Sequence, residues 1–270
     1  MDYQTLLFET PEPGLGVITL NRPDRLNAMN LQMLDDLYAL YGALEKDDKV
    51  RVLILTGSGR GFCSGADLKD RQLMSEESLK KFASAALHLE HIQKRYSGVI
   101  TGMRRLPQPV VAAVKGPAAG GGMCLALASD IIIVDPTAAF IPSFINIGLS
   151  GGELGTTYFL PKMVGSAKAS EILMTGRTVA GEEAHAIGLA SCLVGEGELL
   201  DKALETAHTL LGKTPFGLRM TKEAIRRNLD APSLEAAVAL ENRNQSIGCT
   251  TPEFFEAVMA FSKYGFEGDT

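Results

Sequence analysis

Cysteine and histidine are both scarce in this chain, with four residues of each among 270. The cysteines are widely spread and form no C-x-x-C pair, and the histidines form no H-E-x-x-H motif. His88 and His91 stand three residues apart and share a face of a predicted helix, but no cysteine pair accompanies them. We therefore expect reduced thiols rather than disulfides, and no bound metal.

The phosphate-binding motifs of nucleotide enzymes are also absent. A glycine-rich turn at residues 56–68 begins like a dinucleotide fingerprint, but Phe62 and Ser64 occupy the two places where a third glycine would complete G-x-G-x-x-G. No G-x-x-x-x-G-K-[ST] loop occurs either. These absences predict that the protein does not bind a nicotinamide cofactor.

No apolar run approaches the ~20 residues that a membrane-spanning helix needs. Residues 1–4 lack the basic and apolar segments of a signal peptide. The net charge of −6 and the pI near 5.3 oppose general nucleic-acid binding, which favours basic surfaces, yet they allow a local basic patch for a phosphorylated ligand. We expect a cytoplasmic protein without a membrane or nucleic-acid partner.

What the sequence does contain is an alternation of apolar strand-like runs and helical segments. Residues 31–46 place apolar side chains at helical spacing, residues 78–105 are long and mixed, and residues 121–128 are apolar throughout. The alternation predicts an α/β core over residues 1–196, followed by an all-helical region over residues 197–270. Strands are expected at 6–9, 16–20, 50–55, 110–114, 130–134 and 191–194, and C-terminal helices at 199–211, 214–229, 233–245 and 252–261.

Two glycine-rich turns carry most of the functional information. One covers residues 56–68 after the strand at 50–55, and the other covers residues 115–124 after the strand at 110–114. Glycine allows a backbone to turn sharply and approach a ligand closely, and N–H groups at a following helix start are free to bind an anion. Two such turns that converge on one oxygen would stabilise an enolate or oxyanion. The alternative is that the glycines merely close turns.

Several further blocks occur in order along the chain, and together they make it resemble the crotonase (enoyl-CoA hydratase/isomerase) superfamily. The resemblance implies a ββα spiral core, and trimers, often paired into hexamers, built largely through the C-terminal helices. It also implies an acyl-CoA thioester as substrate, with coenzyme A part of that substrate and no separate cofactor. The blocks are V-I-T-L-N-R-P at 17–23, L-N-A-M at 26–29, G-A-D-L at 65–68, G-G-G at 120–122, A-S-D-I at 128–131, L-P-K-M-V-G at 160–165 and A-H-A-I-G-L-A at 184–190.

The resemblance assigns the backbone N–H groups of Ala66 and Gly121 as donors to the thioester oxygen. Charge on that oxygen grows as the α-proton leaves, so donors placed there favour the enolate over the ground state. Lys69 or Arg25 would meet a CoA phosphate, and the alternative for both is a solvated surface charge. The resemblance also assigns substrate or CoA contacts to Leu26, Ala28, Ser64, Asp67, Leu68, Gly120 and Phe144.

Hydratases of this superfamily use two glutamates, and neither is present here. Cys124 stands at one of the two positions and Phe144 at the other. Hydration needs one group to activate water and one to deliver a proton, so we expect little hydratase activity. Residues 148–162 instead resemble the Δ3,Δ2-enoyl-CoA isomerases, whose single catalytic glutamate corresponds to Glu153.

Three functions stay open at this point. The first is double-bond isomerisation with Glu153 as base, and the second is another enolate chemistry such as weak hydration, decarboxylation or dehalogenation. The third is a catalytically silent acyl-CoA-binding protein, in which Glu153 only complements the dipole in the first turn of a helix.

Overall fold

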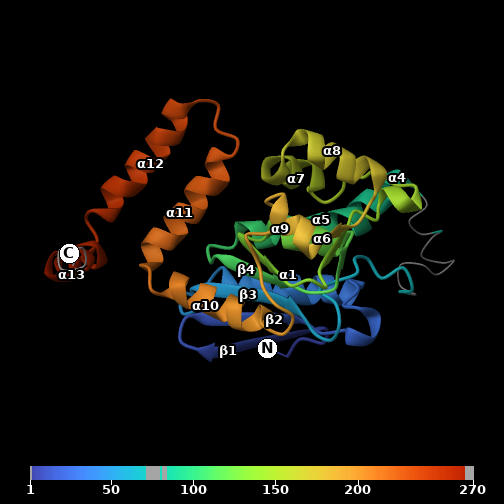
Figure 1. Ribbon diagram of the computed structural model, residues 1–270, viewed down its shortest axis with the longest axis horizontal. Coiled ribbons are helices and arrows are strands. Elements are labelled where there is room, and N and C mark those ends of the chain that lie inside the picture. Colours follow the sequence, from blue (N-terminus) through green and yellow to red (C-terminus); the bar gives the residue numbers. More distant parts are fainter. Residues whose placement is uncertain (1, 71–79, 81–83, 265–270) are drawn as a thin grey trace. The chain divides into compact units, whose positions relative to one another are not determined.

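The structure, a computed structural model, describes residues 2–70, 80 and 84–264, with side chains as far as residue 260. It consists of two compact units, residues Met1–Thr209 and Leu210–Thr270 (Figure 1). The boundary lies near the end of α10 (Leu199–Leu211), later than the change that we expected after residue 196. Most of α10 belongs to the first unit, where His208 pairs with Glu12 of the first strand.

Six strands form the main sheet of the first unit, in the order β1–β2–β3–β4–β6–β9. β1 and β2 pair antiparallel, and the other neighbours pair in parallel. Parallel strands covered on both faces are apolar along their whole length, and every residue of β3 and β4 is buried. The six strands expected from the sequence are confirmed, most of them with shifted ends. They are β1 Leu6–Glu12, β2 Leu15–Leu20, β3 Val52–Gly57, β4 Val110–Val114, β6 Ile131–Val134 and β9 Cys192–Leu193.

A second, smaller sheet has the order β5–β7–β8 and was not expected from the sequence. Its strands are β5 (Pro117–Ala119), β7 (Ala139–Ile141) and β8 (Val179–Ala180). β5 lies within the second glycine-rich turn, with two residues between it and the end of β4 and one residue between it and the start of α6. The pairing of β5 with β7 therefore fixes the middle of this turn in the small sheet.

Helices pack on the sheets in a chain of contacts, with α1 against α5, α5 against α6, α6 against α7 and α7 against α8. The helix expected at 78–105 is divided: its described part comprises α4, the π-helical segment η2 and α5, while residues 78–79 and 81–83 lie outside the described residues. The helices of the first unit are η1 Pro23–Arg25, α1 Leu31–Leu44, α4 Ala85–His88, η2 Leu89–Gln93, α5 Lys94–Arg105, α6 Gly121–Ala128, η3 Ile145–Ile147, α7 Thr156–Val164, α8 Ser166–Thr175 and α9 Gly181–Ala186.

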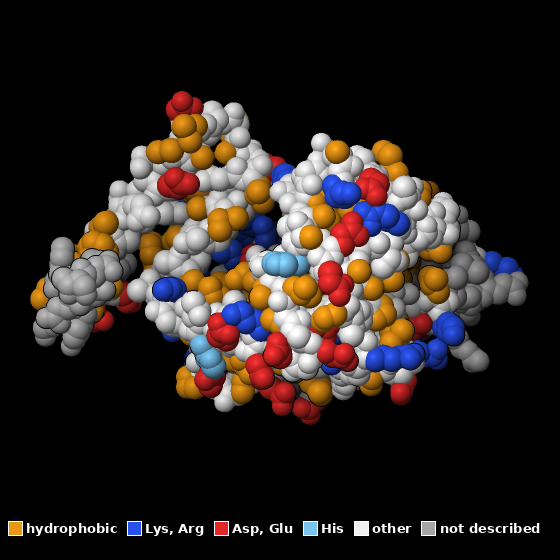
Figure 2. All heavy atoms as spheres, viewed as in Figure 1, with side chains coloured by type: hydrophobic (Ala, Val, Ile, Leu, Met, Phe, Trp, Pro, Cys, Tyr) orange, Lys and Arg blue, Asp and Glu red, His pale blue; other side chains and the backbone are white. Residues whose placement is uncertain are grey.

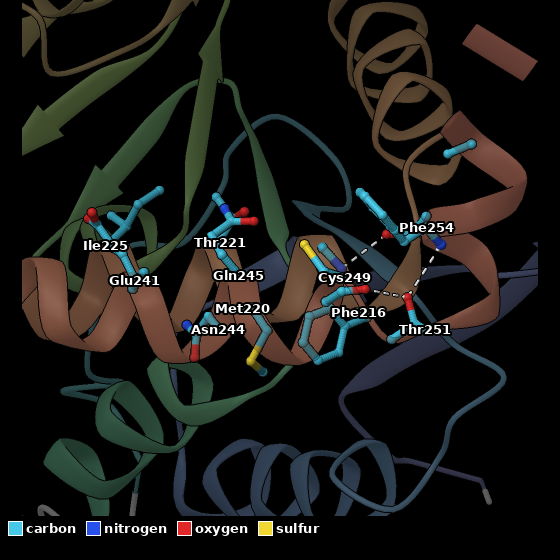
Figure 3. A pocket seen from close by; sticks show the side chains of 15 residues that line it. Phe216, Met220, Thr221, Ile225, Glu241, Asn244, Gln245, Cys249, Thr251 and Phe254 are labelled. Carbon is cyan, nitrogen blue, oxygen red and sulfur yellow. Dashed lines mark hydrogen bonds between the residues drawn. The ribbon is translucent and has the colours of Figure 1, made fainter. Parts of the chain in front are cut away.

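The second unit contains α11 (Pro215–Asn228), α12 (Leu234–Gly248) and α13 (Pro252–Tyr264), which confirms the helices expected there. Side-chain oxygens of Thr214, Ser233 and Thr251 accept N–H groups of the first turns at 3.1–3.3 Å. Such caps fix where a helix begins. A cavity of about 490 Å³ lies between the three helices (Figure 3).

Candidate active site

The two glycine-rich turns begin at neighbouring places because β3 and β4 are adjacent parallel strands, with Leu55 opposite Ala112. Carboxyl ends of parallel neighbours meet at one edge of a sheet, which is where open α/β sheets bind ligands. The first turn follows β3, and the second follows β4 through β5 into α6. The topology thus brings together two segments that are about 60 residues apart in sequence.

Asn27 organises the first turn from inside the protein. Its side chain is fully buried, and Nδ2 donates to the carbonyl oxygens of Ser58 and Gly61, at 2.9 Å each. Its Oδ1 accepts the backbone N–H of Arg22 at 2.9 Å. Asn27 adopts a positive φ of 55°, a conformation that asparagine tolerates better than most residues. We assigned no role to Asn27 from the sequence, although it stands inside the L-N-A-M block.

An ion pair between Arg22 and Asp67 closes the end of the first turn. Arg22 Nη2 lies 2.8 Å from Asp67 Oδ2, and the exposed fractions of the two side chains are 19% and 7%. Arg22 also donates to the carbonyl of Ala28, and Asp67 Oδ1 accepts the N–H of Lys69 at 3.0 Å. The Asp67 carboxylate, expected to contact CoA, is thus engaged within the protein.

Ala66 is held with its N–H directed away from the neighbouring backbone segment at Met29. Met29 donates to the carbonyl of Gly65 at 2.7 Å and accepts from the N–H of Asp67 at 2.9 Å. This is a parallel bridge between Met29 and Ala66, in which Ala66 itself supplies neither bond. Within the described part of the chain, no acceptor is assigned to the N–H of Ala66, which is an exposed residue.

The second turn is bound to the first by the backbone of Cys63. Cys63 N–H donates to the carbonyl of Pro117 at 3.0 Å, and its carbonyl accepts the N–H of Ala119 at 2.9 Å. A Cβ on Gly122 would lie 2.0 Å from the Cys63 oxygen, so only glycine allows this approach. Gly121 is the first residue of α6, and N–H groups in a helix's first turn have no acceptor within that helix.

Gly65 shows how closely the two turns meet. It has φ +89°, and a Cβ there would lie 2.7 Å from the carbonyl oxygen of Ala119 and 3.3 Å from the nitrogen of Gly121. Gly65 immediately precedes Ala66. The N–H groups of Ala66 and Gly121 therefore belong to backbone segments that lie side by side. Two N–H groups that bind the same oxygen require such an arrangement.

Both positions of the missing hydratase glutamates lie beside the second turn. The Cε1 atom of Phe144 is 3.5 Å from where a Cβ on Gly120 would stand. Cys124 is buried in α6, where burial, followed by the charge of Glu153, raises the pKa of its thiol. An uncharged thiol and a phenyl ring therefore stand where a hydratase has carboxylates.

Glu153 lies next to the start of α6. Its carbonyl is 3.7 Å from the Sγ atom of Cys124, which is three residues after Gly121. The side chain of the following residue, Leu154, reaches within 3.5 Å of a Cβ built on Gly121. The half-buried Glu153 is thus on the same side of the molecule as the two turns.

Glu153 does not lie in the first turn of a helix, which was the alternative to a catalytic role. It precedes α7 by three residues, Gly155 is the N-cap, and the first turn of α7 contains no acidic residue. Glu153 N–H donates to Thr156 Oγ1 at 3.0 Å, and Thr156 in turn donates to Gly151 at 2.8 Å. The interpretation of Glu153 as a first-turn residue is therefore wrong.

Other residues expected at the site lie around the first turn. Arg25, Leu68 and Lys69 are exposed, Leu26 and Ser64 are half-buried, and Ala28 is buried. Ser64 Oγ donates to the carbonyl of Arg25 at 3.3 Å. In the described ranges there is no group of three or more side chains arranged to hold a metal ion. Every helix in those ranges is too short or too polar to cross a membrane.

Residues 10–265 match the family model described as "Enoyl-CoA hydratase/isomerase". The chain belongs to this family. A probable enoyl-CoA hydratase of Mycobacterium bovis is similar to it, with 43% identity over 94% of this chain and 89% of that protein. The match places the chain in the crotonase superfamily and confirms the resemblance found in the sequence.

Solved structures of the family have the same fold. An enoyl-CoA hydratase from Bacillus anthracis superposes with a TM-score of 0.88 at 31% identity, covering 96% of each chain. A monofunctional enoyl-CoA isomerase from M. smegmatis superposes with a TM-score of 0.71 at 38% identity, covering 87% of this chain and 98% of that one. The crotonase-type α/β fold is confirmed, and both hydratases and isomerases of the family share it.

Proposed function

We propose that this chain isomerises the double bond of an enoyl-CoA, with Glu153 as its base and the N–H groups of Ala66 and Gly121 as oxyanion donors. The observation that carries the proposal is the contact of Glu153 with the first turn of α6. This contact is made by the backbone carbonyl of Glu153, and the charge of its carboxylate also raises the pKa of the Cys124 thiol in the same helix. Cys124 and Phe144 occupy the positions that the resemblance assigns to the hydratase glutamates. A single carboxylate suffices for isomerisation but not for hydration.

In the proposed reaction, the Glu153 carboxylate removes a proton from C2 of a 3-enoyl-CoA. The electron pair moves into the thioester, and the dienolate oxygen accepts hydrogen bonds from Ala66 and Gly121. The resulting carboxylic acid returns the proton to C4, and a 2-enoyl-CoA leaves. The carboxylate is regenerated, so the cycle needs neither water nor a separate cofactor.

We assign the CoA portion of the substrate to the first turn and its surroundings. The exposed Arg25 and Lys69 are placed to meet phosphates, and Leu26, Ala28, Ser64 and Leu68 provide the adjoining surface. Gly120 and Phe144 are assigned to the acyl side. Asp67 is left out, because Arg22 and the N–H of Lys69 already engage its carboxylate.

We also propose a homotrimer or hexamer, located in the cytoplasm, without a nucleic-acid partner. Apolar side chains gather on the surface of the second unit (Figure 2), including Leu234, which is 75% exposed, and Phe255, which is 58% exposed. Exposed apolar surface of this kind marks sites of protein association.

The proposal is tested with a panel of 3-enoyl-CoA thioesters of different chain length, followed by the appearance of 2-enoyl product. Glu153→Gln should bind acyl-CoA normally and lower isomerisation by ~10²-fold or more, because the amide accepts no proton at neutral pH. It should also abolish deuterium exchange at C2 of a bound saturated acyl-CoA. The matched control is Glu182→Gln, since Glu182 is an exposed glutamate in the first turn of α9.

Crotonyl-CoA hydration, measured in parallel, should stay well below the ~10 per second typical of enzymes. Hydration at that rate would show that a different acid–base pair operates. If Glu153→Gln isomerises as fast as the wild type, Glu153 is not the base. If the wild type neither isomerises nor exchanges any thioester, the protein is a binding protein.

A further inference from the structure

Gln93 contacts the Glu153 carboxylate from a distant part of the chain. It is the last residue of η2, 60 residues before Glu153, and its Nε2 donates to Glu153 Oε1. The backbone N–H of Leu154 donates to the same oxygen at 3.2 Å. No donor from the described residues is assigned to Oε2. The two carboxylate oxygens therefore differ: Oε1 is fixed by two donors, and Oε2 is available to a substrate.

The Leu154 contact depends on an uncommon backbone conformation. Leu154 has φ +47°, a left-handed value that leucine seldom adopts. The Thr156 hydroxyl, on the C-terminal side of Leu154, bonds to the backbone of Gly151 and Glu153 on its N-terminal side and so closes the turn around Leu154. Such strained conformations concentrate at functional sites. In this protein the residue with the left-handed conformation, Leu154, is the one whose backbone N–H donates to Oε1 of Glu153.

Gln93 is itself fixed by the helix that carries it. The π-helical segment η2 ends at Gln93 and continues into α5, and π-helical turns occur frequently at functional sites. Close by in α5, the buried Tyr96 donates its hydroxyl to the carbonyl of Met29 at 2.9 Å. The same carbonyl accepts the N–H of Asp67, next to Ala66. One helix thus contacts both the carboxylate and the segment that bears a proposed oxyanion donor.

We infer that Gln93 is a positioning residue, which holds Oε1 of Glu153 so that Oε2 carries the proton between C2 and C4. This inference rests on the proposed role of Glu153 as the base. A base must lie within hydrogen-bond reach of the proton that it removes, and small misplacements reduce the rate strongly. Without Gln93, the carboxylate keeps only the Leu154 N–H and can rotate away from the substrate.

The test is Gln93→Met, which keeps a long unbranched side chain and removes the amide. We expect kcat for isomerisation to fall about tenfold, with KM changed less than about twofold, because positioning affects the reacting state more than binding. Deuterium exchange at C2 of a bound saturated acyl-CoA should slow by a similar factor, because that exchange depends on the same positioned carboxylate.

The matched control is Gln32→Met, because Gln32 donates to Asp36 Oδ1 at 2.9 Å within α1, outside the proposed site. It should leave kcat and the rate of deuterium exchange unchanged. Circular dichroism should show both variants folded. An unchanged kcat and an unchanged exchange rate in Gln93→Met would overturn the positioning role. If Glu153→Gln retains full activity, Glu153 is not the base. The activity of Glu153→Gln therefore distinguishes a failure of the proposed base from a failure of the positioning role of Gln93.

Discussion

Gly65 is one of the residues at which the backbones of the two turns come close together. Its φ of +89° is already unfavourable for a side chain, and a Cβ would lie 2.7 Å from the Ala119 oxygen. We expect Gly65→Ala to cost more than the ~1 kcal/mol of a left-handed alanine alone, since the two turns must also move apart. Isomerisation should fall more than stability alone explains, because Ala66 is displaced from Gly121. Thermal unfolding and kcat measured on the same preparation check this.

The control for this prediction separates backbone strain from collision. Gly197 has φ +92°, and nothing lies within 4 Å of the Cβ that an alanine would add there. Gly197→Ala should therefore show only the strain and keep its activity. Equal losses of stability and activity in the two variants would mean that contact between the turns does not depend on Gly65.

At the scale of elements, the segment from β2 to the first turn depends on the Arg22–Asp67 pair. Asp67→Asn leaves the largely buried Arg22 guanidinium without its charged partner, and breaking such a pair costs roughly 3 kcal/mol. Unfolding in urea should show this loss. Glu205→Gln is the control, since the Lys202–Glu205 pair is 34% and 66% exposed and such pairs contribute about 1 kcal/mol or less. Equal stability of the two variants would contradict a structural role for Asp67.

Elements differed in how well the sequence predicted them, for physical reasons. The buried parallel strands have continuous apolar runs, so β3 and β4 could be located. β5, β7 and β8 have three residues or fewer, which is too short for any periodicity to appear. α7 was not expected from the sequence. It contains Pro161, a residue that usually ends helices, and its N-cap is Gly155 rather than a residue with a capping side chain.

The candidate site was predicted only where its parts are local in sequence. The glycine turns, Glu153 and the missing hydratase carboxylates all follow from short motifs. The Gln93–Glu153 contact joins residues 60 positions apart, through a helix whose π-helical segment leaves no clear sequence signal. The resemblance assigned Asp67 a contact with CoA, but the ion pair of its carboxylate with Arg22 joins residues 45 positions apart and was not anticipated.

At the scale of the whole molecule, large apolar side chains of the second unit are exposed to solvent in the single chain. Leu234 of α12 and Phe255 of α13 are 75% and 58% exposed. Burying them against other copies would gain roughly 1.5–3 kcal/mol for each fully buried side chain. The exposed side chains favour association, and the resemblance to the crotonase superfamily implies three or six copies. We expect the full chain at micromolar concentration to sediment with the mass of a trimer or hexamer of the 28.9 kDa protomer.

Replacing both residues in Leu234→Glu/Phe255→Glu should lower the sedimenting mass, because a charge buried at an interface without a partner is strongly unfavourable. The control is Met174→Glu in α8 of the first unit, since Met174 is 76% exposed and equally apolar. That variant should keep the wild-type mass, and circular dichroism should show both variants with wild-type helix content. A monomeric wild type would contradict the proposed assembly. A double variant with unchanged mass would instead show that the copies associate through a surface other than α12 and α13.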